Sequence, residues 1–188
     1  MGKSTVAAQF RRAHIRVFDA DGEVHRLQGP GGSAVQAIGA AFPGVLTGDP
    51  AWVDRSRLRA IVLADPGALR RLEGILHPAV RVAQARFLRQ AHAAGQRLAV
   101  LDIPLLFETG GAGRVDRVMV VSAPSAVQRV RVRGRRRMTD AQIDAIIAQQ
   151  WPDREKRRRA DVVIHTGLSR RHAYIKVHRF LLMTKDRR

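Results

Sequence analysis

The sequence predicts an α/β fold in which helices alternate with short strands that pair mostly in parallel. Four short apolar runs have the composition of buried strands, at residues 15–18, 98–103, 118–121 and 161–164. Segments with helical spacing follow or separate these runs, and that alternation favours parallel pairing. Residues 22–95 carry helical patterns almost throughout, which indicates a helical insertion between the first two strands.

The expected helices are recognised by apolar residues at helical spacing and by the residues that begin or end them. They are a helix from about residue 4, then 33–42, 54–64, 68–76, 80–94, 127–132, 140–150 and 169–183. Asp54 is a plausible N-cap, since its carboxylate can accept from the first free amides. We expect Asp65-Pro66-Gly67 and His77-Pro78 to interrupt the insertion helices, and Gly134–Arg137 to join two helices after the third strand.

The composition is that of a globular protein with one sizeable core. The chain has 188 residues, of which 45% are hydrophobic, and it contains no cysteine. The lack of cysteine excludes disulfides, thiolate metal sites and a cysteine nucleophile. Neither a signal peptide nor a membrane-spanning run is recognisable, so we expect a cytoplasmic protein without a membrane partner.

The charge balance is strongly basic, with 34 Lys and Arg against 16 Asp and Glu and a formal net charge of +18. Such a balance favours a polyanionic partner or a phosphorylated substrate. A coding bias toward arginine explains the excess equally well. Aromatic residues are only 5% of the chain and do not interleave with basic ones, so nucleic-acid binding is not expected as the main function.

The chain opens with Met1-Gly2-Lys3-Ser4-Thr5, which matches the closing half of the phosphate-binding pattern G-x-x-x-x-G-K-[ST]. In that pattern backbone amides cradle phosphates, the lysine reaches the β- and γ-phosphates and the hydroxyl binds Mg²⁺. Apolar residues continue the motif as a helix, which places Ser4 in a first helical turn that attracts anions. The alternative is a disordered terminal tail.

Two carboxylates are expected near this loop. Asp21 follows the strand at 15–18, and Asp102 ends the apolar core of the strand at 98–103. Ligands of parallel α/β sheets gather at the carboxyl ends of the strands. A phosphate loop, Mg²⁺ and a carboxylate that accepts the attacking hydroxyl's proton are the minimum for phosphoryl transfer. The alternative interpretation is that Asp19 and Asp21 cap a helix and that Asp102 satisfies backbone groups.

Basic residues and one His-Pro pair complete the candidate site. Arginines between 129 and 137 are placed to close over phosphates as a lid. The alternative for Arg135, Arg136 and Arg137 is that they are solvent-exposed surface residues without a role in binding. His77 before Pro78 is read more simply as a helix-ending residue than as a functional one.

Several blocks of the sequence together resemble the dephospho-CoA kinase family. The blocks are Val17–Asp21 (V-F-D-A-D), Leu58–Pro78 (ending I-L-H-P), Pro104–Glu108 (P-L-L-F-E) and Gln149–Ile164 (containing E-K-R and R-A-D). They occur in the family's order and span nearly the whole chain. Their combination is far more specific than the short phosphate-loop motif.

The resemblance implies ATP-dependent phosphorylation of the ribose 3′-hydroxyl of dephospho-CoA, with Mg²⁺, by a P-loop kinase fold. The implied core is residues 1–21 and 96–188, with a lid at about 128–155, and residues 22–95 form a helical CoA-binding insertion. A monomer with ATP and dephospho-CoA as its partners is expected.

The resemblance also implies a role for each matching residue. Asp21 is the base, with Lys3 and Arg135 as further catalytic residues. Met1, Gly2, Lys3, Ser4 and Thr5 bind the ATP phosphates. Asp21, His77 and Pro78 bind the acceptor, and Ser4 binds Mg²⁺ with Asp102 as a possible outer-sphere partner.

Three features differ from the family pattern. Arg136 follows Arg135 where the family usually has aspartate, and His165-Thr166 stands where the family has Asp-Asn after the last strand. The first strand and the first glycine of the phosphate loop do not precede Met1. We expect a protein that begins at Met1 to be poorly stable or inactive, and the true start to lie upstream.

Three alternatives remain open from the sequence. One is another small-molecule P-loop kinase that acts on a nucleoside or nucleotide. Another is a basic, non-catalytic protein derived from a kinase that binds RNA or membranes. The last is a kinase fold without activity, because the phosphate loop is cut.

Overall fold

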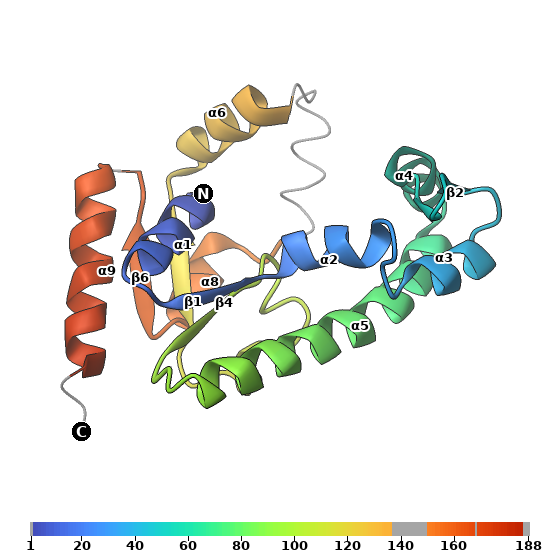
Figure 1. Cartoon of the computed structure of the whole chain (residues 1–188). Coiled ribbons are helices and arrows are strands. Elements are labelled where there is room, and N and C mark those ends of the chain that lie inside the picture. The colour runs from blue at the N-terminus through green and yellow to red at the C-terminus, as the bar shows by residue number, and fades with distance from the viewer. Residues whose placement is uncertain (1, 137–149, 168, 186–188) are drawn as a thin grey trace. The chain divides into compact units, whose positions relative to one another are not determined.

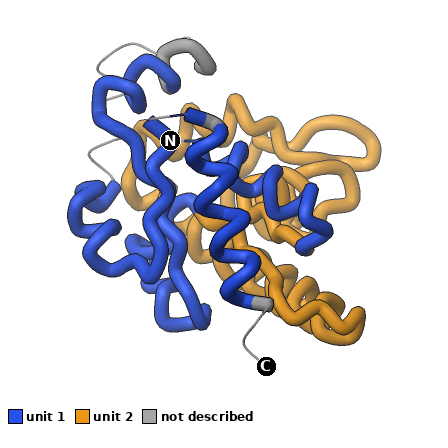
Figure 2. The backbone as a smooth tube through the Cα atoms, turned by 90° about the vertical axis from the view of Figure 1, so that its left-hand side faces the viewer, with its two compact units in different colours: residues 1–15, 104–188 blue, residues 16–103 orange. Residues whose placement is uncertain are grey.

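The computed structural model describes residues 2–136, 150–167 and 169–185. The chain divides into two compact units (Figure 2). We call residues 16–103 the central unit, and residues 1–15 together with 104–188 the terminal unit. Each unit contains one pair of parallel strands, and each is described by itself below.

The central unit begins and ends with its two parallel strands. β1 (Arg16–Asp19) pairs with β4 (Ala99–Asp102), and the register runs from Arg16 opposite Ala99 to Asp19 opposite Asp102. Four helices lie between these strands in the chain (Figure 1). They are α2 (Ala20–Gln28), α3 (Val35–Ala41), α4 (Arg55–Ala64) and α5 (Pro66–Ala93).

Aspartates begin three of these helices, because a carboxylate satisfies amides that the first turn leaves unpaired. The N-cap predicted at Asp54 is confirmed: its Oδ1 accepts hydrogen bonds from the amides of Ser56 at 2.9 Å and Arg57 at 3.1 Å. Asp65 caps α5 through the Gly67 amide at 2.7 Å. That hydrogen bond lowers the pKa of Asp65 below its ordinary value.

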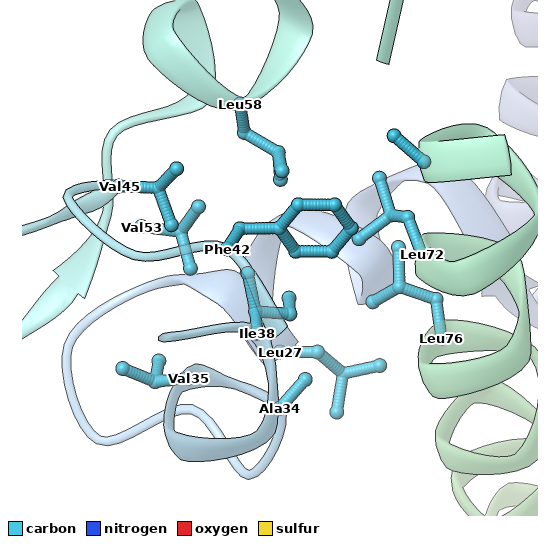
Figure 3. Packing of buried hydrophobic residues seen from close by; sticks show 11 residues of the cluster. Leu27, Ala34, Val35, Ile38, Phe42, Val45, Val53, Leu58, Leu72 and Leu76 are labelled. Atoms are coloured by element: carbon cyan, nitrogen blue, oxygen red, sulfur yellow. The ribbon is translucent and has the colours of Figure 1, made fainter. Parts of the chain in front are cut away.

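The hydrophobic core of the central unit is built by its helices (Figure 3). Phe42 lies at its centre, with Leu72 and Leu76 of α5 on one side of its ring and Ile38 of α3 below it in this view. The other members are Leu27, Ala34, Val35, Val45, Val53, Leu58 and Ala68. The Phe18 ring of β1 contacts Phe87 of α5 at a centroid distance of 5.5 Å, which ties the strand pair to the long helix.

The insertion is not entirely helical, and this corrects the prediction from sequence. β2 (Leu46–Thr47) and β3 (Trp52–Val53) form a short antiparallel hairpin. Val45 and Val53 are buried in the core on either side of the turn. The turn contains Gly48 at φ +79°, a left-handed conformation that residues with side chains rarely adopt.

The predicted interruption at His77-Pro78 is also wrong, since α5 continues through it from Pro66 to Ala93. Proline has no N–H, and its ring crowds the carbonyl four residues earlier. That residue is Gly74, beside which a Cβ would meet open space. Leu72 and Leu76 are both buried on this stretch, so packing holds the helix together across the proline.

The terminal unit contains the second pair of parallel strands. β5 (Met119–Ser122) pairs with β6 (Val162–His165) in register from Met119 opposite Val162 to Ser122 opposite His165. Among the described residues of this unit, the other elements are α1 (Lys3–Arg12), the 3₁₀ helix η1 (Ala112–Arg114), α6 (Ser125–Arg136), α8 (Asp153–Arg158) and α9 (Arg170–Lys185).

Apolar faces of α1, β6 and α9 form the core of this unit. Phe10 of α1 is 2% exposed and contacts Phe180 of α9 edge-on at 6.2 Å. Ile164 of β6 is fully buried, and Ala173 and Val177 of α9 are each 2% exposed. The amphipathic terminal helix predicted from sequence is therefore confirmed.

The helix after β5 is longer than the sequence suggested. α6 continues through Gly134 to Arg136. The break between helices that was expected to begin at Gly134 is therefore not present at that residue. Residues 140–149 of the helix predicted at 140–150 lie outside the described residues. Among the described residues, no helix combines the length and the apolar character needed to cross a membrane.

Candidate active site

The phosphate-loop residues lie at the start of α1. Gly2 precedes the helix in a left-handed conformation, with φ 89° and ψ 13°. Its carbonyl accepts hydrogen bonds from the amides of Thr5 at 3.1 Å and Val6 at 3.2 Å. Ser4 therefore lies in the first helical turn, as predicted, where an α-helix leaves amides without a partner inside the helix. The side chains of Ser4 and Thr5 are exposed, and Lys3 is half-buried.

Thr166 packs directly against this loop, a contact that no local pattern in the sequence indicates. A Cβ built on Gly2 would come within 3.2 Å of the Thr166 Cβ and Oγ1. Thr166 follows β6 and is anchored on the end of β5, because its amide and hydroxyl both donate to the Ser122 carbonyl, at 2.8 Å and 3.2 Å. The glycine is required here by its backbone conformation and by this close neighbour.

Arg131 connects the same threonine to α6. Its guanidinium donates to the Thr166 carbonyl at 2.8 Å through Nη2 and to the Thr166 hydroxyl at 3.3 Å through Nη1. Arg131 belongs to the basic run that was predicted to close over phosphates. Arg135 lies one helical turn further along α6, and its side chain is outside the described residues.

The predicted carboxylates come together at one end of the β1–β4 pair. Asp19 and Asp102 are partners in the register at the carboxyl ends of the two strands. Asp19 acts as the N-cap of α2, since its Oδ1 accepts from the Gly22 amide at 3.0 Å. The capping interpretation is thus correct for Asp19. Asp21 lies in the first turn of α2 with an exposed side chain, and its role as a base stays a prediction.

The predicted site residues are divided between the two units. Gly2 to Thr5 and Arg135 belong to the terminal unit, whereas Asp21, His77, Pro78 and Asp102 belong to the central unit. His77 and Pro78 are exposed near the middle of α5. The structure brings Asp21 and Asp102 to one end of a strand pair, and Gly2 beside Thr166. A joint site of both groups stays a prediction, and Met1 lies outside the described residues.

A buried ion pair joins two of the recognised sequence blocks inside the terminal unit. Glu108 Oε1 accepts from Lys156 Nζ at 2.7 Å and from the Trp151 amide at 2.9 Å. The Trp151 ring stacks on the Phe107 ring with 5.8 Å between their centroids. The Arg159 guanidinium lies 4.5 Å from the centroid of the Trp151 ring. Glu108 and Trp151 are 43 residues apart in the chain, so no local pattern in the sequence indicates that the two blocks pair.

The pKa of Glu108 reflects two opposed effects. Burial acts to raise it, because desolvation penalises a carboxylate. Hydrogen bonds from Lys156 and the Trp151 amide, with the lysine's charge, outweigh burial and place the pKa below its ordinary value of 4.5. The Glu108 carboxylate is therefore ionised at neutral pH, and its ion pair with Lys156 links the two sequence blocks.

The oxygen ligands that the protein offers near α1 suit a Mg²⁺ ion that is coordinated mainly by substrate phosphates. The described residues include no group of three or more His, Asp or Glu side chains placed to hold a metal ion. Ser4 offers an exposed hydroxyl oxygen at the helix start. Mg²⁺ usually takes one or two protein oxygens together with substrate phosphates and waters, so this donor set fits it.

Comparison with known proteins identifies the family. Residues 1–170 match the family model described as dephospho-CoA kinase. The dephospho-CoA kinase of Mesorhizobium japonicum is 53% identical over 167 residues, which cover 89% of this chain and 83% of that protein. The dephospho-CoA kinase of Gluconobacter oxydans is 50% identical over 184 residues, which cover 96% of this chain and 90% of that protein.

Solved structures agree with this match. The crystal structure of TT1252 from Thermus thermophilus is 31% identical with a TM-score of 0.83, covering 97% of this chain and 91% of that one. Dephospho-CoA kinase from Campylobacter jejuni is 22% identical with a TM-score of 0.70, covering 98% and 92%, and it supports the fold. From the family match and these relatives, we conclude that the chain belongs to the dephospho-CoA kinase family.

Proposed function

We propose that this protein transfers the γ-phosphoryl group of ATP to the ribose 3′-hydroxyl of dephospho-CoA, which yields CoA and ADP. The observation that carries the proposal is the match of residues 1–170 to the dephospho-CoA kinase family. The reaction is the last step of CoA biosynthesis. Phosphoryl transfer depends mainly on positioning and electrostatic stabilisation, so the proposal concerns where charges and donors lie.

The start of α1 is the proposed site for the ATP phosphates. The backbone amides of Gly2, Lys3 and Ser4 and the exposed hydroxyl of Thr5 would bind the phosphates at the positive end of the helix dipole. Lys3 adds a full positive charge for the β- and γ-phosphates. Support comes from the left-handed Gly2 and the exposed hydroxyl of Ser4 at this turn. We include Met1 as a backbone contact to the ATP phosphates, and only the sequence motif supports this assignment.

Asp21 is the proposed base for the acceptor hydroxyl. Its carboxylate is exposed at the carboxyl end of β1, where α/β proteins bind ligands. It makes no N-cap hydrogen bond in the described part of the chain, because Asp19 caps α2 instead. We assign His77 and Pro78 to binding of the acceptor, since both are exposed in the central unit.

Arg135 and Mg²⁺ complete the proposed machinery. Arg135 would place its charge on the transferred phosphoryl group. Ser4 would hold Mg²⁺ through its hydroxyl, with Asp102 as an outer-sphere partner. When bound, the ion neutralises charge on the β- and γ-phosphate oxygens. We further propose that the protein acts as a monomer in the cytoplasm.

A substrate panel tests the proposal. A purified protein whose phosphate loop is complete is incubated with Mg-ATP and either dephospho-CoA, nucleosides or nucleoside monophosphates, and ADP release is followed. We expect turnover with dephospho-CoA. Turnover with nucleosides but not dephospho-CoA would establish the other kinase class, and salt-sensitive RNA binding without ATP turnover would establish a polyanion-binding protein.

Variants of two residues test the assignment of roles. Asp21→Asn should lower kcat by at least about a hundredfold and leave ATP binding intact, because it removes the base alone. Lys3→Ala should weaken both ATP binding and the rate. The control is Asp116→Asn, at an exposed aspartate of the terminal unit. Near-normal kcat in Asp21→Asn would exclude Asp21 as the base.

A further inference from the structure

The C-terminal helix α9 buries only one of its faces. Ala173 and Val177 on that face are each 2% exposed, and Phe180 contacts Phe10 of α1. This face closes the core of the terminal unit beside α1 and β6 (Figure 1). An amphipathic helix that covers a core normally presents polar residues to solvent. The opposite side of α9 departs from that rule.

The opposite side of α9, which we call its outer face, consists of exposed residues at helical spacing. They lie at i, i+3, i+4, i+7, i+8 and i+11, so they share one side of the helix. The residues are Arg171, Tyr174, Ile175, His178, Arg179 and Leu182. Apolar and aromatic side chains therefore alternate with basic ones along this face.

The apolar members of the outer face remain in water in the folded protein. Tyr174 is 56% exposed, Ile175 46% and Leu182 50%. Ile175 and Leu182 are seven residues apart, so they lie in line along the helix. The Tyr174 ring stacks on the His178 ring with 5.9 Å between their centroids. Single exposed apolar residues are common, but several on one face indicate a surface that binds a partner.

The charges of the outer face have one sign. Residues 170–185 include no Asp or Glu. Within the described part of the chain, Arg171 and Arg179 form no ion pair. An arginine stem can lie along an apolar surface while its guanidinium binds a phosphate. The face therefore matches a partner that is both apolar and anionic.

The charge and the shape of this face decide between partners. A second copy of the chain does not fit, because two outer faces would bring their arginines together without a carboxylate. RNA fits poorly, since the Tyr174 ring is already stacked on His178 and no other aromatic side chain belongs to this face. A bilayer with anionic lipids fits both properties, since its acyl region accepts apolar side chains and its phosphates accept guanidinium groups.

We propose that the outer face of α9 binds the surface of bilayers that contain anionic phospholipids, with the helix lying flat in the headgroup region. Ile175 and Leu182 enter the boundary of the acyl chains, and Arg171 and Arg179 contact lipid phosphates. A surface contact of this kind needs no membrane-spanning segment. It replaces the expectation from sequence of no membrane partner, which was based on the lack of a spanning run. The proposal goes beyond the kinase reaction and does not depend on it.

Vesicle flotation tests the proposal with the protein used for the substrate panel. The vesicles consist of phosphatidylcholine alone, or of a mixture in which phosphatidylglycerol replaces about a third of it. We expect the protein to float with the mixed vesicles and not with phosphatidylcholine alone. High salt should weaken the binding, because it screens the arginines from the lipid phosphates. No flotation with the mixed vesicles overturns the proposal.

The apolar contribution is tested by Ile175→Gln combined with Leu182→Gln, since glutamine keeps a high helix propensity and removes the apolar contact. We expect the affinity for mixed vesicles to fall at least about tenfold. The matched control is Leu63→Gln combined with Val82→Gln, at residues of the central unit that are 74% and 62% exposed. The control should bind like the wild type, and an equal loss in both pairs overturns the proposal. Thermal unfolding checks that both variants are folded.

The charge contribution is tested by Arg171→Gln combined with Arg179→Gln. We expect the affinity for mixed vesicles to fall about 25-fold, the product of about fivefold for each arginine near an anionic surface. Arg59→Gln combined with Arg81→Gln removes the same net charge at exposed arginines outside α9. This control should change the affinity far less. An equal loss would assign the binding to the overall charge of the protein and overturn the proposal.

A spin label measures whether this face enters the bilayer. The chain contains no cysteine, so Leu182→Cys provides one attachment site for a nitroxide. Mixed vesicles should raise the collisions of the label with oxygen and lower those with a polar nickel complex, because oxygen partitions into the acyl region. A label at Leu63→Cys should show no change. Unchanged collisions at position 182 overturn the proposal even if the protein floats.

Two further outcomes also overturn the proposal. A dimer in sedimentation that Ile175→Gln with Leu182→Gln dissociates would assign the outer face to a second copy of the chain. RNA binding that Arg171→Gln with Arg179→Gln abolishes, in the absence of vesicle binding, would assign the face to a nucleic acid.

Discussion

The Arg131 guanidinium donates hydrogen bonds to both oxygens of Thr166, at 2.8 Å to the carbonyl and 3.3 Å to the hydroxyl. Thr166 also packs against Gly2, the glycine of the phosphate-binding motif that directly precedes α1. One threonine therefore connects α6 with the N-terminus of α1.

Thr166→Val tests whether this connection positions the phosphate loop. The substitution keeps the shape of the side chain and removes the hydroxyl that Arg131 and the Ser122 carbonyl share. We expect KM for ATP to rise about fivefold, the factor for about 1 kcal/mol of hydrogen bonding. Thr166→Ser should restore the wild-type value. Equal KM values in all three proteins would show that the hydroxyl has no positioning role.

Gly2→Ala separates backbone strain from the steric contact with Thr166. A left-handed conformation costs an alanine about 1–2 kcal/mol, and the new Cβ would lie 3.2 Å from Thr166. The control Gly31→Ala has φ +69° and no neighbour within 4 Å. Both variants should lose stability in thermal unfolding, but only Gly2→Ala should raise KM for ATP. A rise in both would assign the effect to strain alone.

Lys156→Met tests the buried ion pair with Glu108. Lys156 and Glu108 have side chains only 9% and 13% exposed, so removal of the lysine leaves an uncompensated carboxylate in the interior. We expect the free energy of unfolding to fall by about 3–5 kcal/mol, measured by urea denaturation. Arg158→Met breaks the exposed pair with Glu155 and should cost less than about 1 kcal/mol.

The same pair predicts a pH dependence of stability. The pKa of Glu108 in the folded protein lies below its ordinary value of 4.5, so the unfolded chain binds the proton more tightly. The contribution of Glu108 is complete well above pH 4.5 and is lost as the pH falls through the folded pKa. The stability advantage of wild type over Glu108→Gln should therefore shrink on acidification from pH 7. An advantage that grows toward acid pH would reverse the sign.

Pro78→Ala tests whether the proline inside α5 is kept for function. Alanine restores a backbone N–H for the Gly74 carbonyl and has a far higher helix propensity. We expect the free energy of unfolding to rise by about 1–3 kcal/mol. If Pro78 shapes the acceptor site as proposed, KM for dephospho-CoA should rise at the same time. A more stable enzyme with unchanged kinetics would leave Pro78 without a binding role.

Local sequence was sufficient for the elements whose signal is local. The strands β1 (Arg16–Asp19) and β6 (Val162–His165) each begin and end one residue later than predicted. Apolar composition indicates that a strand is present, but it does not define the residue at which backbone hydrogen bonding to the neighbouring strand ends. The cap at Asp54 depends on amides two and three residues away. The helix that follows Gly2 is likewise predicted by residues that lie within two helical turns of one another.

The sequence by itself thus determined the α/β class, the parallel pairing, the helix that carries Gly2 to Thr5 and the acid that follows β1. Tertiary structure alone decided the β2–β3 hairpin, the continuity of α5 through Pro78, the contact of Thr166 with Gly2, and the buried ion pair of Glu108 with Lys156. The physical reason is range. Periodicity and capping act within a few residues, whereas burial and ion pairing join segments that only the folded chain brings together.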